Sequence, residues 1–140
     1  LAWSADYVGF PFGTGGLISG FSSFGLAADL GFKPNIGAPG GGIFSSYPLE
    51  LGGAATLSGT SMSAPHVAGG VALVLEANPR IKANAMQARL QNSADPKNWS
   101  GNAALGLLDH SFRQGAGMLD LMGTINATTV IEPSQLALGE

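Results

Sequence analysis

The feature that most constrains this fold is a stretch of mostly small and apolar residues from 60 to 77. Valines and leucines recur there at helical spacing with alanines between them, so the stretch predicts one long α-helix. Apolar or small side chains occur on every side of this helix, which is typical of a helix buried inside a larger fold. Asn78 and Pro79 follow directly and predict its end. Such a helix needs other elements packed around it on all sides.

Short strands are predicted where apolar runs stand between turn residues, at residues 43–46 and 54–57 and around Leu17, Ile18 and Phe21. Residues 34–39 predict the end of a strand that runs into the tight glycine loop at 40–42. A turn is expected at residues 48–53.

Two further helices are expected after the long one, at residues 82–91 and from 115 to 122, with a polar surface loop between them. After residue 128 the pattern changes to β alternation, with Val130 and Ile131 first and Leu136 and Leu138 later. The chain thus predicts short strands and helices followed by a β tail.

Composition excludes several function classes. The 6 Lys and Arg residues against 9 Asp and Glu residues give a formal net charge of −3, so a basic nucleic-acid surface and a polybasic membrane patch are not expected. The absence of cysteine excludes disulfides, zinc–thiolate sites and thiol nucleophiles. The longest apolar run is far shorter than a membrane span. Two sequons, at Asn98 and Asn126, permit glycosylation if the chain is secreted.

Ser61 stands at the first turn of the long helix, within the run Gly-Thr-Ser-Met-Ser-Ala-Pro-His-Val-Ala-Gly at residues 59–69. Backbone N–H groups are unpaired at such a place, and the helix dipole favours negative charge. A serine there can attack a carbonyl carbon while its own N–H binds the oxyanion that forms. Gly59 lets the chain turn sharply into the helix. The alternative is that Ser61 or Thr60 only caps the helix.

The run at residues 59–69 resembles the nucleophile segment of the subtilisin-like serine proteases, the subtilases. Three other segments resemble the family in the same order: Phe-Ser-Ser-Phe-Gly at 21–25, Lys-Pro-Asn-Ile-Gly-Ala-Pro-Gly at 33–40 and Gln-Gly-Ala-Gly-Met-Leu at 114–119. The resemblance implies that Ser61 is the nucleophile of a Ser-His-Asp triad, for which subtilisin itself is a standard example. It also implies that Pro65, His66 and Gly69 are helix residues, His66 being packed and structural.

A finer resemblance is to large secreted subtilases that carry a protease-associated domain. It rests on Ala-Pro-Gly-Gly-Gly-Ile at 38–43, on Ser-Ser-Tyr-Pro at 45–48 and on the tail at 131–136, which is similar to the lead into a fibronectin-III-like domain. The resemblance implies that residues 1–128 are the C-terminal part of a subtilase catalytic domain. Residues 129–140 are expected to be a linker or the start of the following domain. A secreted, extracellular location is implied as well.

The fold implied by the resemblance is the subtilase three-layer α/β sandwich with a parallel sheet, of which this chain would hold only part. The start without Met and the sequence at the C-terminus suggest a piece of a longer protein. A central apolar helix without its full cover leaves apolar surface exposed, so we expect the chain alone to be unstable or prone to aggregate.

The other triad members have no matching residue. In the family, Asp and His precede Ser, and an oxyanion Asn lies between His and Ser. Both histidines of this chain, His66 and His110, follow Ser61. Three residues precede Ser61 without the family's triad or oxyanion motifs around them: Asp6, Asp29 and Asn35.

The leading hypothesis is a serine endopeptidase that forms an acyl-enzyme on Ser61, with this chain supplying only the nucleophile part. The implied partners are a peptide substrate and the remainder of the catalytic domain, which would carry Asp, His and the oxyanion Asn. Neither nucleic acid nor a membrane is an expected partner. No cofactor is indicated within the chain, although the complete family fold allows calcium. The alternatives are an inactive subtilase remnant that acts as a binding or structural module, and a His110 that folds back to serve Ser61.

Three other features are interpreted as structural. The glycine loop at 37–42 is not followed by Lys-Ser or Lys-Thr, so we predict a tight turn and not a phosphate-binding loop. Asp109 and His110 are interpreted as a solvated loop pair rather than as metal ligands or a base. Met118 and Met122 stand at helical spacing and are interpreted as a core pair.

Overall fold

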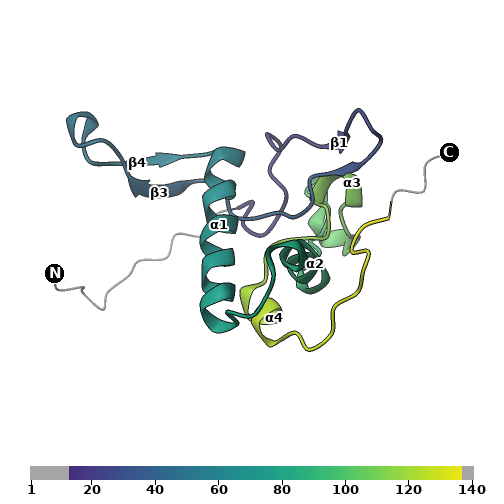
Figure 1. The fold of residues 1–140 in the computed structure, drawn as a ribbon. Coiled ribbons are helices and arrows are strands. Elements are labelled where there is room, and N and C mark those ends of the chain that lie inside the picture. Colours follow the sequence, from purple (N-terminus) through teal and green to yellow (C-terminus); the bar gives the residue numbers. More distant parts are fainter. Residues whose placement is uncertain (1–12, 137–140) are drawn as a thin grey trace.

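The structure, a computed structural model, describes residues 13–136. Its longest element is helix α1 (Thr60–Ala77), and the other elements lie on two sides of it (Figure 1). The bounds of α1 are those predicted from the sequence. Asn78 ends the helix, and its N–H donates to the Val74 carbonyl at 2.9 Å.

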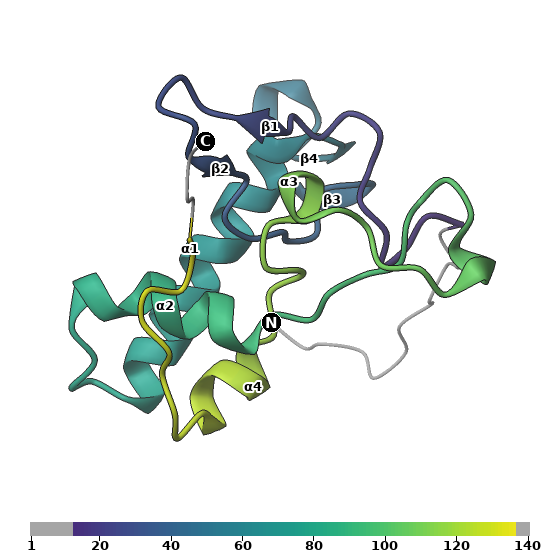
Figure 2. The same ribbon diagram turned by 90° about the vertical axis from the view of Figure 1, so that its right-hand side faces the viewer.

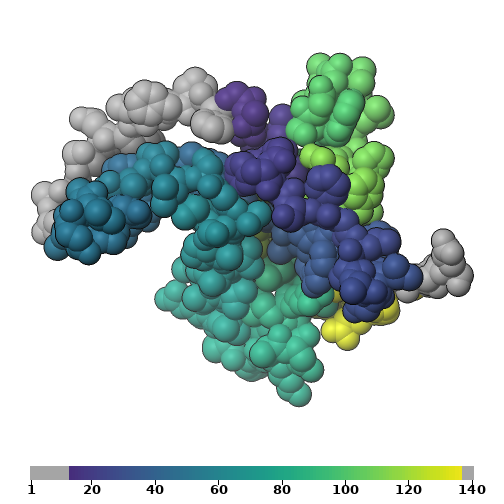
Figure 3. Space-filling model, turned by 90° about the horizontal axis from the view of Figure 1, so that it is seen from above, coloured from purple at the N-terminus to yellow at the C-terminus, as the bar shows by residue number. Residues whose placement is uncertain are grey.

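The strands form two small antiparallel sheets. Strand β1 (Gly25–Leu26) pairs with β2 (Phe32–Lys33), and β3 (Ile43–Ser46) pairs with β4 (Ala54–Leu57). The β3–β4 hairpin turns through the short 3-10 helix η1 (Leu49–Leu51) and confirms the two strands predicted there. Figure 3 shows this hairpin extending from one side of the molecule.

The strand predicted around Leu17 and Phe21 is wrong. Residues 13–16 form turns, residues 17–24 belong to no strand, and the chain becomes extended only at β1. The reason lies in the glycines at 13, 15, 16 and 20, which favour turns over extended pairing.

The remaining helices are short and follow α1. They are α2 (Ala83–Ser93), the 3-10 helix η2 (Ala103–Leu105), α3 (Ser111–Gln114) and α4 (Leu121–Asn126). Helix α2 confirms the helix predicted at 82–91. None of the helices in the described part of the chain is long and apolar enough to cross a membrane.

The helix predicted from 115 to 122 is wrong, because two glycines there have left-handed backbone angles and touch other segments. Gly115 (φ 64°) and Gly117 (φ 126°) leave no room for a side chain, since a Cβ on either would lie 2.5 Å from the backbone of Asn35 or Asp95. The chain is extended at Met118, whose backbone exchanges two hydrogen bonds of 2.8 Å with the backbone of Asp95. Helix α4 begins later, and the Asp120 carboxylate caps it by accepting from Gly123 N at 2.9 Å.

The described residues are of mixed α and β structure, as the predicted fold class requires. Both sheets that the structure describes are antiparallel, and the one parallel pairing found within residues 13–136 is the bridge between Gly37 and Met118. The extended parallel sheet therefore remains a prediction. Residues 129–136 form no strand, and Leu138 lies outside the described residues.

The core lies where one face of α1 meets α2 and α4. Val74, Met86 and Leu90 form it, and partly buried apolar side chains surround them: Ile36, Val67, Val71, Ile81, Leu119, Leu121 and Ile125. Within α1 itself only Gly70 and Val74 are buried. The prediction that this helix is buried on all sides is thus wrong for the described chain, because the β3–β4 hairpin leaves an open groove along its other face.

The C-terminal segment crosses α2 and reaches β2 (Figure 2). Asn92 Nδ2 donates to the Ile131 carbonyl at 3.0 Å, and Ser134 Oγ donates to Gln91 Oε1 at 2.6 Å. Gln135 Nε2 then donates to the Phe32 carbonyl at 2.8 Å. Side-chain hydrogen bonds therefore tie this segment to the rest of the described chain.

Candidate active site

Ser61 is the second residue of α1 and is exposed. Gly59 occupies the N-cap position, and no side chain caps the helix. The alternative that Thr60 or Ser61 serves as the cap is therefore wrong. Met62 N donates to the Gly59 carbonyl at 3.0 Å, whereas Ser61 N makes no hydrogen bond among the described residues. The Ser61 N–H is thus available to an incoming oxygen.

The glycine loop at 40–42 holds the segment that leads into α1. Gly59 N donates to the Gly40 carbonyl at 2.8 Å, and Gly42 N donates to Ser58 Oγ at 2.8 Å. The loop leads directly into strand β3 and not into a helix. Its glycines serve a close approach between two backbone segments, as predicted for a tight turn, and the geometry is not that of a phosphate-binding loop.

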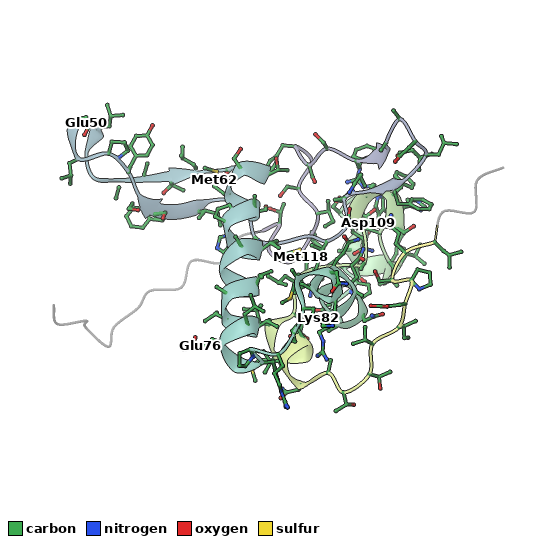
Figure 4. The ribbon with its side chains drawn as sticks, viewed as in Figure 1. Glu50, Met62, Glu76, Lys82, Asp109 and Met118 are labelled. Atoms are coloured by element: carbon green, nitrogen blue, oxygen red, sulfur yellow. The ribbon has the colours of Figure 1, made fainter. Side chains whose placement is uncertain are left out.

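A groove of about 580 Å³ lies between the β3–β4 hairpin and the Ser61 face of α1. Its lining is mostly apolar, and it includes Ser61, His66, Phe44, Tyr47, Leu57 and Leu73. In Figure 4, Met62 marks the place where the first turn of α1 meets β4. Ser61 therefore faces an open apolar surface at one end of the helix.

His66 lines the same groove but does not bond Ser61. Its ring Nδ1 lies 2.8 Å from the Met62 carbonyl, to which it donates as Nδ1–H. The side chain is exposed, so the prediction of a packed histidine is wrong for the described chain. The open face of α1 is the reason, since no described element covers His66 there.

His110 lies elsewhere in the fold. Its ring stacks on Phe112 with centroids 5.1 Å apart and an interplanar angle of 12°. The adjacent helix α3 lies on the opposite side of α1 from the hairpin (Figure 1). The structure thus does not bring His110 to Ser61, and the hypothesis that it folds back to serve Ser61 is wrong for the described chain.

Asp109 is not the solvated residue that the sequence predicted. Its side chain is fully buried, beside α3 (Figure 4), where it accepts from Arg113 Nε at 3.3 Å and from the His110 N–H at 2.8 Å. Arg113 stands four residues later and neutralises the carboxylate. Its guanidinium also lies 4.8 Å from the centre of the Phe24 ring. This ion pair organises the loop before α3 and makes no hydrogen bond with Ser61.

The remaining candidates stay apart from Ser61. Asp29 is exposed in the β1–β2 turn and accepts from Gly31 N at 3.1 Å. The Asn35 carbonyl accepts from Gln91 Nε2 at 3.1 Å and from Ala116 N at 3.1 Å. Asp6 lies outside the described residues. Within residues 13–136, no three His, Cys, Asp or Glu side chains gather to hold a metal ion.

Met118 and Met122 do not form a core pair. Met122 is 67 % exposed on α4, whereas Met118 belongs to the extended segment before that helix and is half-buried. The prediction is wrong because Gly115 and Gly117 prevent the helix that would have put both methionines on one face.

Sequence analysis also missed a buried glutamine. Gln114 is only 3 % exposed. Its Oε1 accepts from Lys97 N at 2.8 Å, and its Nε2 donates to the carbonyls of Asp109 at 2.6 Å and Lys97 at 3.3 Å. A polar residue next to two left-handed glycines gave no periodic signal that would have marked it as buried.

The sequence of this chain is similar to those of known proteins. The model of the peptidase S8 family, the subtilases, matches residues 12–117. The chain belongs to the subtilase family. The resemblance of the Ser61 run and its neighbouring segments is thereby confirmed.

Several curated subtilases are similar to this chain. Pyrolysin of Pyrococcus furiosus is 52 % identical over 73 residues, which is 50 % of this chain and 5 % of pyrolysin. The minor extracellular protease Vpr of Bacillus subtilis is 32 % identical over 133 residues, or 87 % of this chain and 15 % of Vpr. Subtilisin-like protease SBT4.10 of Arabidopsis thaliana is 36 % identical over 129 residues, or 82 % of this chain and 18 % of its own length. The matches thus span between 5 % and 18 % of these relatives.

Proposed function

We propose that this chain supplies the nucleophile of a serine endopeptidase. Ser61 Oγ attacks the carbonyl carbon of a peptide bond, and its proton passes to a base. The base gives this proton to the leaving amine as the C–N bond breaks, which leaves an acyl-enzyme on Ser61. Water then hydrolyses the ester and frees Ser61. The observation that carries this proposal is the exposed Ser61 at the start of α1, whose N–H is unpaired among the described residues, within a chain of the subtilase family.

The base and the oxyanion partner come from other segments of the full-length protein. Subtilases use a His, an Asp and an oxyanion Asn that precede the nucleophile, and the structure brings neither His66 nor His110 into a bond with Ser61. The Ser61 N–H would donate one hydrogen bond to the oxyanion and the Asn the other. The same segments would complete the parallel sheet of the three-layer fold and cover the open face of α1.

The wider setting belongs to the same proposal. Residues 1–128 are the C-terminal part of the catalytic domain, and residues 129–140 lead into a fibronectin-III-like domain. The substrate is a protein or peptide, and the enzyme is secreted. The name of Vpr, an extracellular protease, supports secretion. The family fold allows calcium in the complete enzyme.

The test is Ser61→Ala in the full-length protein, with hydrolysis of a fluorogenic peptide and labelling by a fluorophosphonate as readouts. We expect turnover to fall on the order of a millionfold, which is the loss known for subtilisin itself, and labelling to disappear. Ser111→Ala, exposed in α3, is the matched control and should keep both activities. Near-normal turnover in Ser61→Ala would overturn the proposal.

The alternative is an inactive subtilase remnant that serves as a binding or structural module. The observation that favours it is the lack of a histidine bonded to Ser61 among the described residues. A folded full-length protein that neither hydrolyses peptides nor takes up the fluorophosphonate, with Ser61 intact, would decide for this alternative.

A further inference from the structure

Gly40 makes the closest contact between the glycine loop and the start of α1. It is buried, and a Cβ placed on it would lie 2.2 Å from Ser63 Oγ and 2.7 Å from the Gly59 carbonyl oxygen. Real Cβ atoms essentially never approach a neighbour closer than 3.0 Å. A side chain at this position therefore has to displace the residues on either side of Ser61.

The displaced atoms belong to the turn that holds Ser61. Ser63 Oγ ends a short side chain and can rotate away, but the Gly59 oxygen is backbone and already accepts from Met62 N at 3.0 Å. Two hydrogen bonds, from Gly59 N to Gly40 and from Gly42 N to Ser58 Oγ, tie the loop to this segment. The segment cannot move away from Gly40 without breaking one of them.

We propose that Gly40 is a positioning residue for the nucleophile, an inference that rests on the proposed role of Ser61. Because Gly40 has no side chain, the loop can approach Gly59 closely enough for Gly59 N to donate to the Gly40 carbonyl. This contact fixes the positions of Ser61 Oγ and of the Ser61 N–H. Gly40 itself touches neither the substrate nor the reacting atoms. A displacement of about 1 Å in a catalytic group can cost about 100-fold in rate, so small changes in this contact should be measurable.

The test is Gly40→Ala in the full-length protein, with kcat, KM, the rate of fluorophosphonate labelling and Tm all measured. We expect kcat and the labelling rate to fall together, by about 10- to 100-fold, while KM changes little. The matched control is Gly123→Ala in α4, where a Cβ would also be crowded, 2.7 Å from Asp120 Oδ2. That control should lower Tm and keep kcat, because α4 packs near the other end of α1 (Figure 1).

Two further variants separate positioning from folding. Adding Ser63→Ala to Gly40→Ala removes the 2.2 Å contact and should restore part of the lost kcat without matching recovery of Tm. Ser58→Ala removes the bond from Gly42 N without adding volume and should lower kcat severalfold, which gives a readout even if Gly40→Ala does not fold. The proposal is overturned if Gly40→Ala keeps wild-type kcat, if its loss is no larger than that of Gly123→Ala at equal Tm, or if Ser58→Ala leaves kcat unchanged. Failure of the proposed function itself is read separately, from activity retained by Ser61→Ala.

Discussion

Two faces of α1 carry similar side chains and lie in different surroundings. On one face Val67, Val71 and Val74 pack against α2 and α4, and Val74 is completely buried. On the other face Leu73 is 51 % exposed and lines the same groove as Ser61. An apolar pattern in a helix thus indicates that its faces are to be buried. Which face is buried in the described chain depends on the elements that pack against it.

The uncovered side continues onto the hairpin. Phe44 is 73 % exposed, and Tyr47 and Leu57 stand beside it along the groove. Large contiguous apolar surfaces are uncommon on soluble monomers and usually mark a contact with other protein. We therefore expect other segments of the full-length protein to cover this apolar side of α1 and to leave Ser61 open to the substrate.

The largest effect of the open face of α1 is expected when residues 1–140 are expressed alone. With one face of α1 open, we expect an aggregated or non-cooperatively unfolding chain, because the exposed apolar surface favours association. Size-exclusion chromatography and calorimetry measure this. A compact monomer with one cooperative melting transition would mean that the open face is a true surface.

The covered face is probed next by Leu90→Ala in the full-length protein. Leu90 is 5 % exposed in the core, so the cavity and the lost apolar contact should cost about 2–5 kcal/mol of unfolding free energy. Denaturant titration gives the value. Leu105→Ala, 58 % exposed in η2, is the control. Equal small losses in both variants would contradict the assigned core.

A buried polar contact should have the next largest effect. Gln114→Ala leaves Lys97 N and the Asp109 carbonyl without their partner and should cost about 3 kcal/mol, since unpaired buried polar groups are expensive. Gln87→Ala, exposed in α2 with a single 3.3 Å side-chain bond, should cost far less. An unfolding free energy unchanged by Gln114→Ala would show that these hydrogen bonds of Gln114 are not formed.

The open face itself is tested by Leu73→Ala in the full-length protein. If other segments cover this face, the substitution should cost about 2 kcal/mol, the value of burying such a side chain. If Leu73 remains as exposed as in the described chain, the loss of unfolding free energy should be within experimental error. Thermal unfolding of wild type and variant distinguishes the two, and the second result would contradict the proposed covering.

The smallest expected effect is at the C-terminal segment. Asn92→Ala removes the bond to the Ile131 carbonyl at the surface of α2 and should cost about 0.5–1 kcal/mol. Asn84→Ala is the matched control, because it is also exposed in α2 and makes no side-chain hydrogen bond within residues 13–136. Equal stability of the two variants would mean that the segment is not held there.

Much of the local structure follows from the sequence, because it depends on residues near each other along the chain. Periodicity predicts α1 and α2, and apolar runs between turns predict β3 and β4. Prediction fails at Gly115 and Gly117, where contacts with Asn35 and Asp95, distant in the sequence, demand left-handed backbone angles. It also fails at Asp109, where the chain is held against a segment twelve residues earlier by the hydrogen bond from Asp109 N to the Lys97 carbonyl at 2.9 Å.

The nucleophile candidate and the family were determined by the sequence alone, because the chemistry of a serine at a helix start is carried by a contiguous run of residues. Only the tertiary structure decided that Gly40 contacts the turn around Ser61, that both histidines lie out of bonding reach of Ser61, and which face of α1 is covered. These features arise from packing between segments far apart along the chain, and a linear pattern of side chains contains no direct record of such distances.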